Sequence, residues 1–367
     1  MPVAWSSHPD AATATGEVAG ALLEAFAGSP VPFLWVTASA DYLSAFPGIV
    51  TSLRAVLRPA VTLGGTVRGV LGGGPTSAAR PPAGLAVGAF VVDPGALTTH
   101  RIPGGAPMPF ASRVGTVRLG LGTPPPTPTA HDGTEFVLAG TSGPRNRGGL
   151  LALDGTVYAD GAVFVDFAPT AQPRLVVAPA FVPLSPPLTV TASAGVVLRR
   201  SGDRDPATVV TEALGLDAPP GPDLTDRLLV GEFPDGADSS LALVDLRPRR
   251  VLAVDTHSGS FTLSGEVRVG ARIRMLLRDP PSRHPALAGG FGGAGRSAIL
   301  AAGPGALTAG PDDPVTVTSA AGAPGSVIGA VHHRVVVGRD RRITDGTHAV
   351  AGIVFGPGEP RPPTPDP

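Results

Sequence analysis

Short apolar runs separated by turn residues recur along this chain, most clearly between residues 140 and 165. There a polar, glycine-rich loop is followed by Asp154-Gly155 and Asp160-Gly161, each flanked by short apolar stretches. An Asp-Gly pair is a strong hairpin signal, because a type I′ turn needs positive φ at both of its central residues. We therefore predict that both pairs close β-hairpins and that much of the chain consists of short strands.

Helix signals are strongest near the N-terminus. Residues 10–27 carry apolar side chains on one face behind an N-cap aspartate, and residues 49–57 form a second apolar stripe. The strand-like run 31–37 lies between the two helices, and residues 61–71 follow as two short strands around Gly64-Gly65. This strand–helix–strand order predicts an α/β unit.

The composition limits which fold classes are expected. The chain has 50 Gly and 43 Pro, which is typical of disorder, but 43% of its residues are hydrophobic and fall in strand-like runs. These runs favour a folded protein with many turns, and the excess of Ala, Gly, Pro and Arg indicates a GC-rich bacterial genome. We predict an α+β protein (mixed α/β, strand-rich), with two domains of β-sheets flanked by a few helices. The Pro-rich tail at residues 357–367 is expected to be disordered.

The net charge, the lack of cysteine and the lack of targeting signals limit which partners and compartments are expected. A net charge of −1 gives no electrostatic footprint for nucleic acid, and the lack of cysteine excludes disulfides and a thiol nucleophile. We find neither a signal-peptide pattern nor an apolar run of about 20 residues that could span a bilayer. A cytoplasmic protein without membrane contact is expected.

Two motifs have ligand-binding forms. Residues 290–295 match G-x-G-x-x-G, but the residues before them are not strand-like, and Asp312 and Asp313, about twenty residues later, fall within an expected turn. A tight turn before a strand is therefore the simpler interpretation. His332 and His333 are adjacent in an expected strand and would face opposite sides, one inward and one on the surface. A metal cluster with Asp340, Asp345 and His348 is conceivable, but zinc-ligand spacing is missing, so we expect neither metal nor cofactor.

The loop that follows residue 140 contains Thr141, Ser142, Arg145, Asn146 and Arg147 beside several glycines. Backbone amides and guanidinium groups in such a loop can receive a carboxylate or a phosphate, although plain solvated loop residues would look the same. A serine hydrolase would need G-x-S-x-G at a strand-to-helix elbow, and Ser142 lacks that context. We therefore expect no enzyme, with a hydrolase using Ser142 or a His-Asp pair near His348 as the alternative.

The order of segments resembles the FIST family, a sensory domain with N- and C-terminal halves. In the first half the resemblance rests on AWSSHPD, VPFLWVTAS, VTLGGTVRGVLGGG, FVLAGTSG, DGAVFVDF, VVAPAFVPLSPPLTVTASAGVVL and DPATVVTEALG. In the second half it rests on LLVGEF, GSFTLSGEVRVGARIRMLLRDP, GGFGGAGRS and SVIGAV. The family commonly has Phe-Ser-Cys-Asn-Gly-Arg-Gly in its C-terminal domain. This chain departs from that pattern with Gly293 at the cysteine position and Ser297 at the last glycine, and with Val327 where an acidic residue is common.

The resemblance implies two domains, at residues 1–203 and 204–356, and a standalone sensor for a small molecule such as an amino acid or a related carboxylate metabolite. Any signal would pass to a separate signalling protein. A ligand-free protein-interaction scaffold is a further alternative. We expect the ligand between the two halves, at Thr141, Ser142, Arg145, Asn146, Arg278, Asp279, Phe291 and Arg296.

Overall fold

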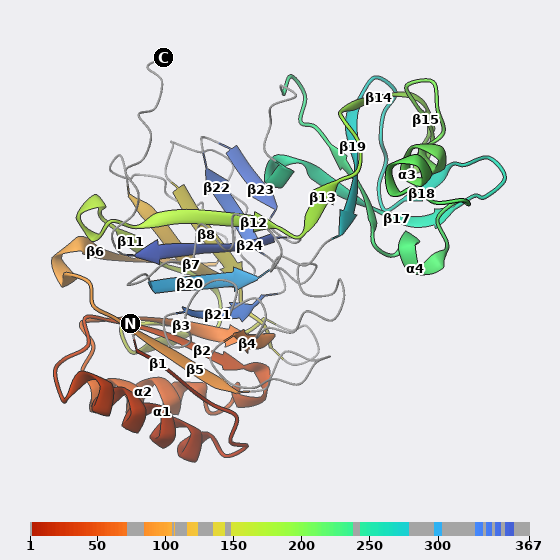
Figure 1. Cartoon of the computed structure of the whole chain (residues 1–367). Coiled ribbons are helices and arrows are strands. Elements are labelled where there is room, and N and C mark those ends of the chain that lie inside the picture. The colour runs from red at the N-terminus through yellow and green to blue at the C-terminus, as the bar shows by residue number, and fades with distance from the viewer. Residues whose placement is uncertain are drawn as a thin grey trace.

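The computed structural model describes residues 2–71, 84–104, 106, 116–123, 135–143, 148–237, 243–278, 297–302, 327–332, 335–339, 342–345 and 349–355. It is strand-rich with few helices, and its strands form three open sheets and a small barrel (Figure 1). The predicted mixed α+β class is confirmed at this level. The tail at 357–367 and the motif at 290–295 lie outside the described residues.

The first sheet has the strand order β1 (Val3–Ser6), β5 (Leu85–Phe90), β2 (Phe33–Ser39), β3 (Val61–Val67), β9 (Leu151–Leu153), β10 (Thr156–Tyr158). β2 and β3 are parallel and are connected through α2 (Phe46–Leu57), which confirms the predicted strand–helix–strand unit. α1 (Ala11–Phe26) and α2 lie side by side under this sheet and bury their apolar stripes against it (Figure 1).

The second sheet has the order β6 (Leu97–Ile102), β11 (Gly161–Phe167), β7 (Val117–Thr123), β8 (Glu135–Gly140), β22 (Val335–Arg339), β23 (Arg342–Asp345). The third has the order β12 (Arg174–Pro179), β24 (Ala349–Phe355), β20 (Ser297–Ala302), β21 (Val327–Val331), β4 (Gly69–Leu71). Short 3-10 turns lie at Ala40–Tyr42, Pro94–Ala96, Pro169–Ala171 and Leu243–Asp245.

The three sheets share one pattern of strand directions. In each, a central parallel pair (β2 and β3, β7 and β8, β20 and β21) is flanked on both sides by antiparallel strands. The strand beside the second member of each pair comes from another third of the chain. β4 joins the third sheet, β9 joins the first, and β22 joins the second. The chain therefore contains three related units, and each unit contributes one strand or a strand pair to the sheet of another unit, in a cycle.

The inner faces of the three sheets meet in a single core. Phe90, Phe167 and Phe355 hold equivalent positions at the ends of β5, β11 and β24, and Phe33 packs among them. The Phe167 and Phe355 ring centroids are 4.9 Å apart and those of Phe90 and Phe355 are 5.4 Å apart, both in edge-to-face geometry. Each buried ring contributes about 1.5–3 kcal/mol of transfer free energy. This aromatic cluster closes one end of the core.

The barrel is inserted between β12 and β20 of the third sheet and stands to one side of the three sheets (Figure 1). β16 (Leu228–Glu232), β17 (Arg247–Val254), β18 (Phe261–Leu263), β15 (Val197–Ser201), β14 (Leu188–Ala194) and β19 (Arg272–Arg278) form it, and β19 pairs with β16 to close it. β13 (Phe181–Pro183) pairs with β19 at the edge, and α3 (Pro206–Leu214) and α4 (Pro222–Thr225) complete the insertion. The expected boundary between residues 203 and 204 falls within this barrel, between β15 and α3.

One of the two predicted Asp-Gly hairpins is confirmed. Asp154 and Gly155 have φ of 48° and 87° and join the antiparallel strands β9 and β10. The other prediction is wrong, because Asp160-Gly161 leads from β10 in the first sheet to β11 in the second. Gly161 still has a φ of 75°, and the Asp160 carboxylate accepts a hydrogen bond from Arg101 at 2.8 Å.

A second correction concerns Gly64-Gly65, which lie inside a single strand, β3, and do not separate two strands before β4. A Cβ on Gly64 would lie 2.7 Å from the Val36 carbonyl oxygen, so the close approach of β2 requires glycine. A Cβ on Gly65 would lie 3.0 Å from both Leu121 and Thr141, which belong to the second sheet and the segment after it. Gly64 therefore allows β2 and β3 to pair closely, and Gly65 allows the first and second sheets to approach each other.

Candidate functional site

Polar side chains gather at the end of the core opposite the aromatic cluster, where the parallel strand pairs end. Register shows which positions correspond, because Leu63, Val137 and Ile328 pair with equivalent residues of β2, β7 and β20. Four residues further along, the corresponding positions are Val67, Thr141 and His332. The three related units thus place one apolar and two polar side chains at this strand end.

Thr141 is buried directly after β8. Its backbone amide and its hydroxyl both donate to the Gly122 carbonyl oxygen at the end of β7, at 3.0 and 3.3 Å. These bonds continue the parallel pairing of β7 and β8 by one residue beyond the strand. The side chain of Thr141 is consequently fixed against the first sheet at Gly65.

His332 is fully buried directly after β21. Its ring Nδ1 lies 3.0 Å from the Gly140 carbonyl oxygen. A carbonyl oxygen only accepts, so Nδ1 carries the proton of this bond, and in the neutral ring Nε2 is then the basic nitrogen. The prediction that one histidine of the pair points inward agrees with this position, and His333 lies outside the described residues.

The main chain of Ser142 is held by two hydrogen bonds to Thr66. Its amide donates to the Thr66 carbonyl oxygen at 2.8 Å, and its own carbonyl accepts from the Thr66 hydroxyl at 2.7 Å. The Ser142 Oγ is buried and has no hydrogen-bond partner among the described residues. Burying a hydroxyl without a partner is unfavourable, which makes this group a candidate contact for a ligand.

The predicted site residues divide between two places. Thr141 and Ser142 meet Thr66 and His332 at the strand ends described above. Arg278 is the last residue of β19 in the barrel, where its amide donates to the Arg227 carbonyl oxygen at 2.7 Å. Burial, together with the nearby Arg250 charge, lowers the pKa of Arg278 from its ordinary value. The other predicted residues, Arg145, Asn146, Asp279, Phe291 and Arg296, lie outside the described residues.

Sequence reasoning missed Thr66 and weighed His332 only as a core residue or a metal ligand. Both stand at or just past the end of a strand that contains glycine, as Ser142 does. A polar residue at the end of a glycine-containing strand was the sequence signal that could have identified them. It carries little weight alone, because turn residues recur after most strands of this chain.

A charged cluster that sequence reasoning also missed lies on the outer face of the second sheet. Arg118 on β7 faces Asp166 on β11, with Nε–Oδ1 and Nη2–Oδ2 distances of 2.6 and 2.8 Å. His100 on β6 reaches the same carboxylate at 3.1 Å. The Arg118 side chain is only 2% exposed, so this is a buried bidentate ion pair.

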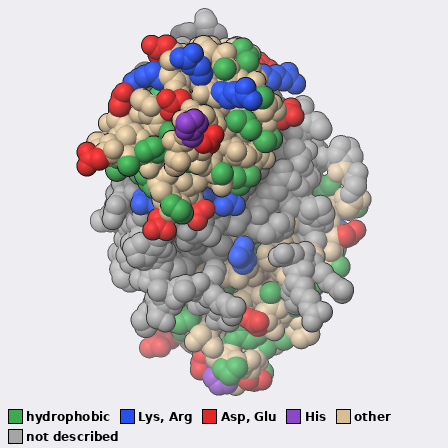
Figure 2. Space-filling model, turned by 90° about the vertical axis from the view of Figure 1, so that its right-hand side faces the viewer, with side chains coloured by type: hydrophobic (Ala, Val, Ile, Leu, Met, Phe, Trp, Pro, Cys, Tyr) green, Lys and Arg blue, Asp and Glu red, His purple; other side chains and the backbone are tan. Residues whose placement is uncertain are grey.

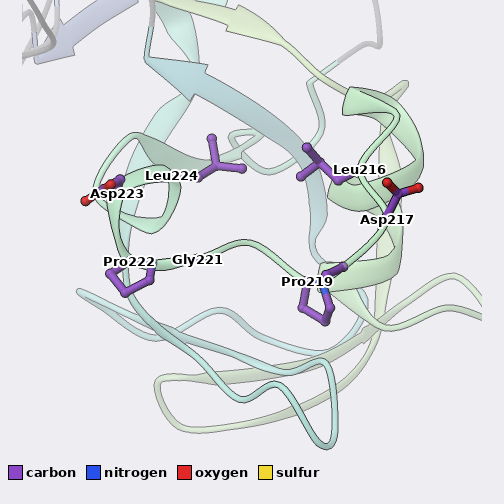
Figure 3. A pocket seen from close by; sticks show the side chains of 8 residues that line it. Leu216, Asp217, Pro219, Gly221, Pro222, Asp223 and Leu224 are labelled. Carbon is purple, nitrogen blue, oxygen red and sulfur yellow. The ribbon is translucent and has the colours of Figure 1, made fainter.

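A hollow of about 440 Å³ lies on the barrel between the ends of α3 and α4. Leu216, Pro219, Pro222 and Leu224 line it, with Asp217 and Asp223 at its two ends (Figure 3). It is away from the strand ends that hold Thr141 and His332. Acidic and basic side chains are interspersed over the exposed face of the barrel (Figure 2).

Within the part of the chain that the structure describes, no three His, Asp or Glu side chains are grouped closely enough to hold a metal ion. None of the described helices is both long and apolar enough to cross a bilayer. No family model matches the chain, and a search of curated proteins finds no significant match.

Proposed function

We propose that this chain is a small-ligand-binding sensory protein of the FIST type, and that its ligand is an amino acid or a related carboxylate metabolite. The ligand would bind where β3, β8 and β21 end, beside Thr141, Ser142 and His332. The observation that carries the proposal is the buried Ser142 hydroxyl, which has fixed main-chain anchors and no partner among the described residues.

The chemistry around Ser142 suits such a ligand. A hydroxyl both donates and accepts, so it can bind either a carboxylate oxygen or an ammonium group. Arg145 and Asn146 follow in the same loop of the sequence, and a guanidinium group can bind a carboxylate through two parallel hydrogen bonds. The protein would then act by binding, and a separate protein would receive the signal.

A thermal-shift screen of the twenty amino acids and a set of carboxylic acids tests the proposal. A ligand at about one hundred times its Kd stabilises the folded state by roughly 2.7 kcal/mol. Ser142→Ala should reduce the shift, whereas Ser201→Ala should not. Ser201 is a suitable control because its Oγ is also buried without a partner in the described part of the chain, but it lies in the barrel. The proposal is wrong if no compound raises the melting temperature, or if both variants respond like the original chain.

A hydrolase is the second candidate, favoured by the geometry of His332. A histidine whose Nδ1 proton is held by an acceptor presents Nε2 as a base, which is how a general base beside a serine nucleophile is oriented. Turnover of an ester or amide panel, abolished by both Ser142→Ala and His332→Ala, would establish this activity in place of sensing.

A further inference from the structure

Thr66 binds both ends of the segment that connects the second sheet to the first. This segment begins after Ser142, at the end of β8, and returns at Leu150, directly before β9. The Thr66 amide donates to the Leu150 carbonyl at 3.0 Å, and the Leu150 amide donates to the Thr66 hydroxyl at 2.9 Å. With the two bonds to Ser142, one residue makes four hydrogen bonds to the two ends of the segment.

The hydroxyl of Thr66 has a role that its main chain cannot replace. It donates to the Ser142 carbonyl and at the same time accepts from the Leu150 amide. Its contacts are made inside a fully buried environment, since Thr66 has no exposed surface. Gly149 packs against the same hydroxyl so closely that a Cβ there would collide with it.

These contacts leave Ser142 with a single unused group. Its amide and its carbonyl both bond to Thr66, and only its Oγ has no partner in the described part of the chain. Thr66 therefore fixes the main chain from which the Ser142 hydroxyl projects. A ligand contact made by a fixed group loses less conformational freedom on binding than one made by a mobile group.

We infer that Thr66 is a positioning residue of the ligand site, acting through Ser142 without touching the ligand. This inference rests on the proposed function, because it assumes that Ser142 binds the ligand. It adds that affinity depends on a hydroxyl in the first unit of the fold, although Ser142 itself belongs to the second.

The test compares Thr66→Val, Thr66→Ser and Thr62→Val. Valine keeps the branched shape of threonine and removes the hydroxyl, whereas serine keeps the hydroxyl. Thr62 is the matched control because it is fully buried on the same face of β3, and its hydroxyl accepts a bond from Arg54 at 3.3 Å, away from Ser142. Affinity is measured by calorimetry for the compound that gives the largest thermal shift in the amino acid and carboxylate screen.

We expect Thr66→Val to weaken binding by about three- to tenfold, because the Ser142 carbonyl loses its donor and the freed residue must then be ordered when the ligand binds. Thr66→Ser and Thr62→Val should bind within about twofold of the original chain. Equal affinity for Thr66→Val and Thr62→Val would overturn the inference.

A ligand-independent measurement separates this inference from the proposed function. Thr66→Val should speed hydrogen exchange of the Leu150 amide, which loses its acceptor, while Thr62→Val leaves it unchanged. If no compound binds the original chain, the proposed function fails even when exchange at Leu150 accelerates as expected. If exchange at Leu150 is unaffected by Thr66→Val, the positioning role itself is wrong.

Discussion

The ion pair between Arg118 and Asp166 gives a prediction whose size follows from the structure. The Arg118 side chain is 2% exposed and that of Asp166 is 11% exposed, so solvent screens the pair weakly. Asp166→Asn keeps the side-chain shape but turns one acceptor oxygen into an amide that points its hydrogens at the guanidinium group. Removing one partner of a buried pair costs about 3–5 kcal/mol, and we expect a loss in this range.

Equilibrium unfolding in urea measures this loss as a lower midpoint with an unchanged slope. His100→Gln is the matched control, because His100 contacts the same carboxylate but its side chain is 36% exposed. Exposed pairs contribute about 0–1 kcal/mol, so the control should stay close to the original chain. The double variant Arg118→Met, Asp166→Leu should recover most of the loss, since apolar residues of similar volume can replace a buried pair. An Asp166→Asn variant within about 1 kcal/mol of the original chain would refute the reasoning.

Further predictions concern packing and ionisation. Gly120→Ala should destabilise the second sheet by about 1–3 kcal/mol or more, because a Cβ there would overlap the buried Phe164 ring. In α1, a Cβ added at Gly16 meets nothing within 4 Å, so Gly16→Ala should stabilise the chain by up to about 1 kcal/mol. Urea unfolding should therefore give a lower midpoint for Gly120→Ala and a higher one for Gly16→Ala. Midpoints that move in the same direction would contradict this account. Burial raises the pKa of Tyr42 above its ordinary value of 10.0. In a Tyr158→Phe background, which leaves Tyr42 as the only tyrosine, the phenolate absorbance should therefore appear above pH 10, and the stability that Tyr42 contributes should be lost as the pH rises through this raised pKa. Titration at or below the ordinary value would show that the ring is not buried in solution.

The local parts of the fold could be predicted from the sequence. α1, α2 and the Asp154-Gly155 turn are determined by residues close together in the chain, namely a cap, an apolar stripe and two positive φ angles. Asp160-Gly161 has the same local signal, but its flanking strands pair with different sheets. Local chemistry cannot report that choice, because the partners of β11 are β6 and β7, far from β10 in the sequence.

The candidate site could be predicted only in part, because some of its residues come together through contacts between distant parts of the chain. Ser142 and Thr141 were found from a glycine-rich loop, but Thr66 bonds to Ser142 across 76 positions and His332 bonds to Gly140 across 192. The threefold relation was hidden as well, since corresponding positions hold chemically different residues such as Val67, Thr141 and His332. Equivalence in this fold is a matter of strand register, which only the paired structure reveals.

The cyclic exchange of strands has a consequence for how the chain is made. During synthesis the N-terminal third emerges first, yet its β4 belongs to a sheet whose other strands come from beyond residue 173. The first sheet has all its strands only after residue 158, the second only after residue 345, and the third only when β24 has left the ribosome. Until then, paired strands are left with open edges and uncovered apolar faces. A chain stopped before residue 349 would lack the strand that joins β12 to β20, so the third sheet cannot form until this seven-residue strand has been made.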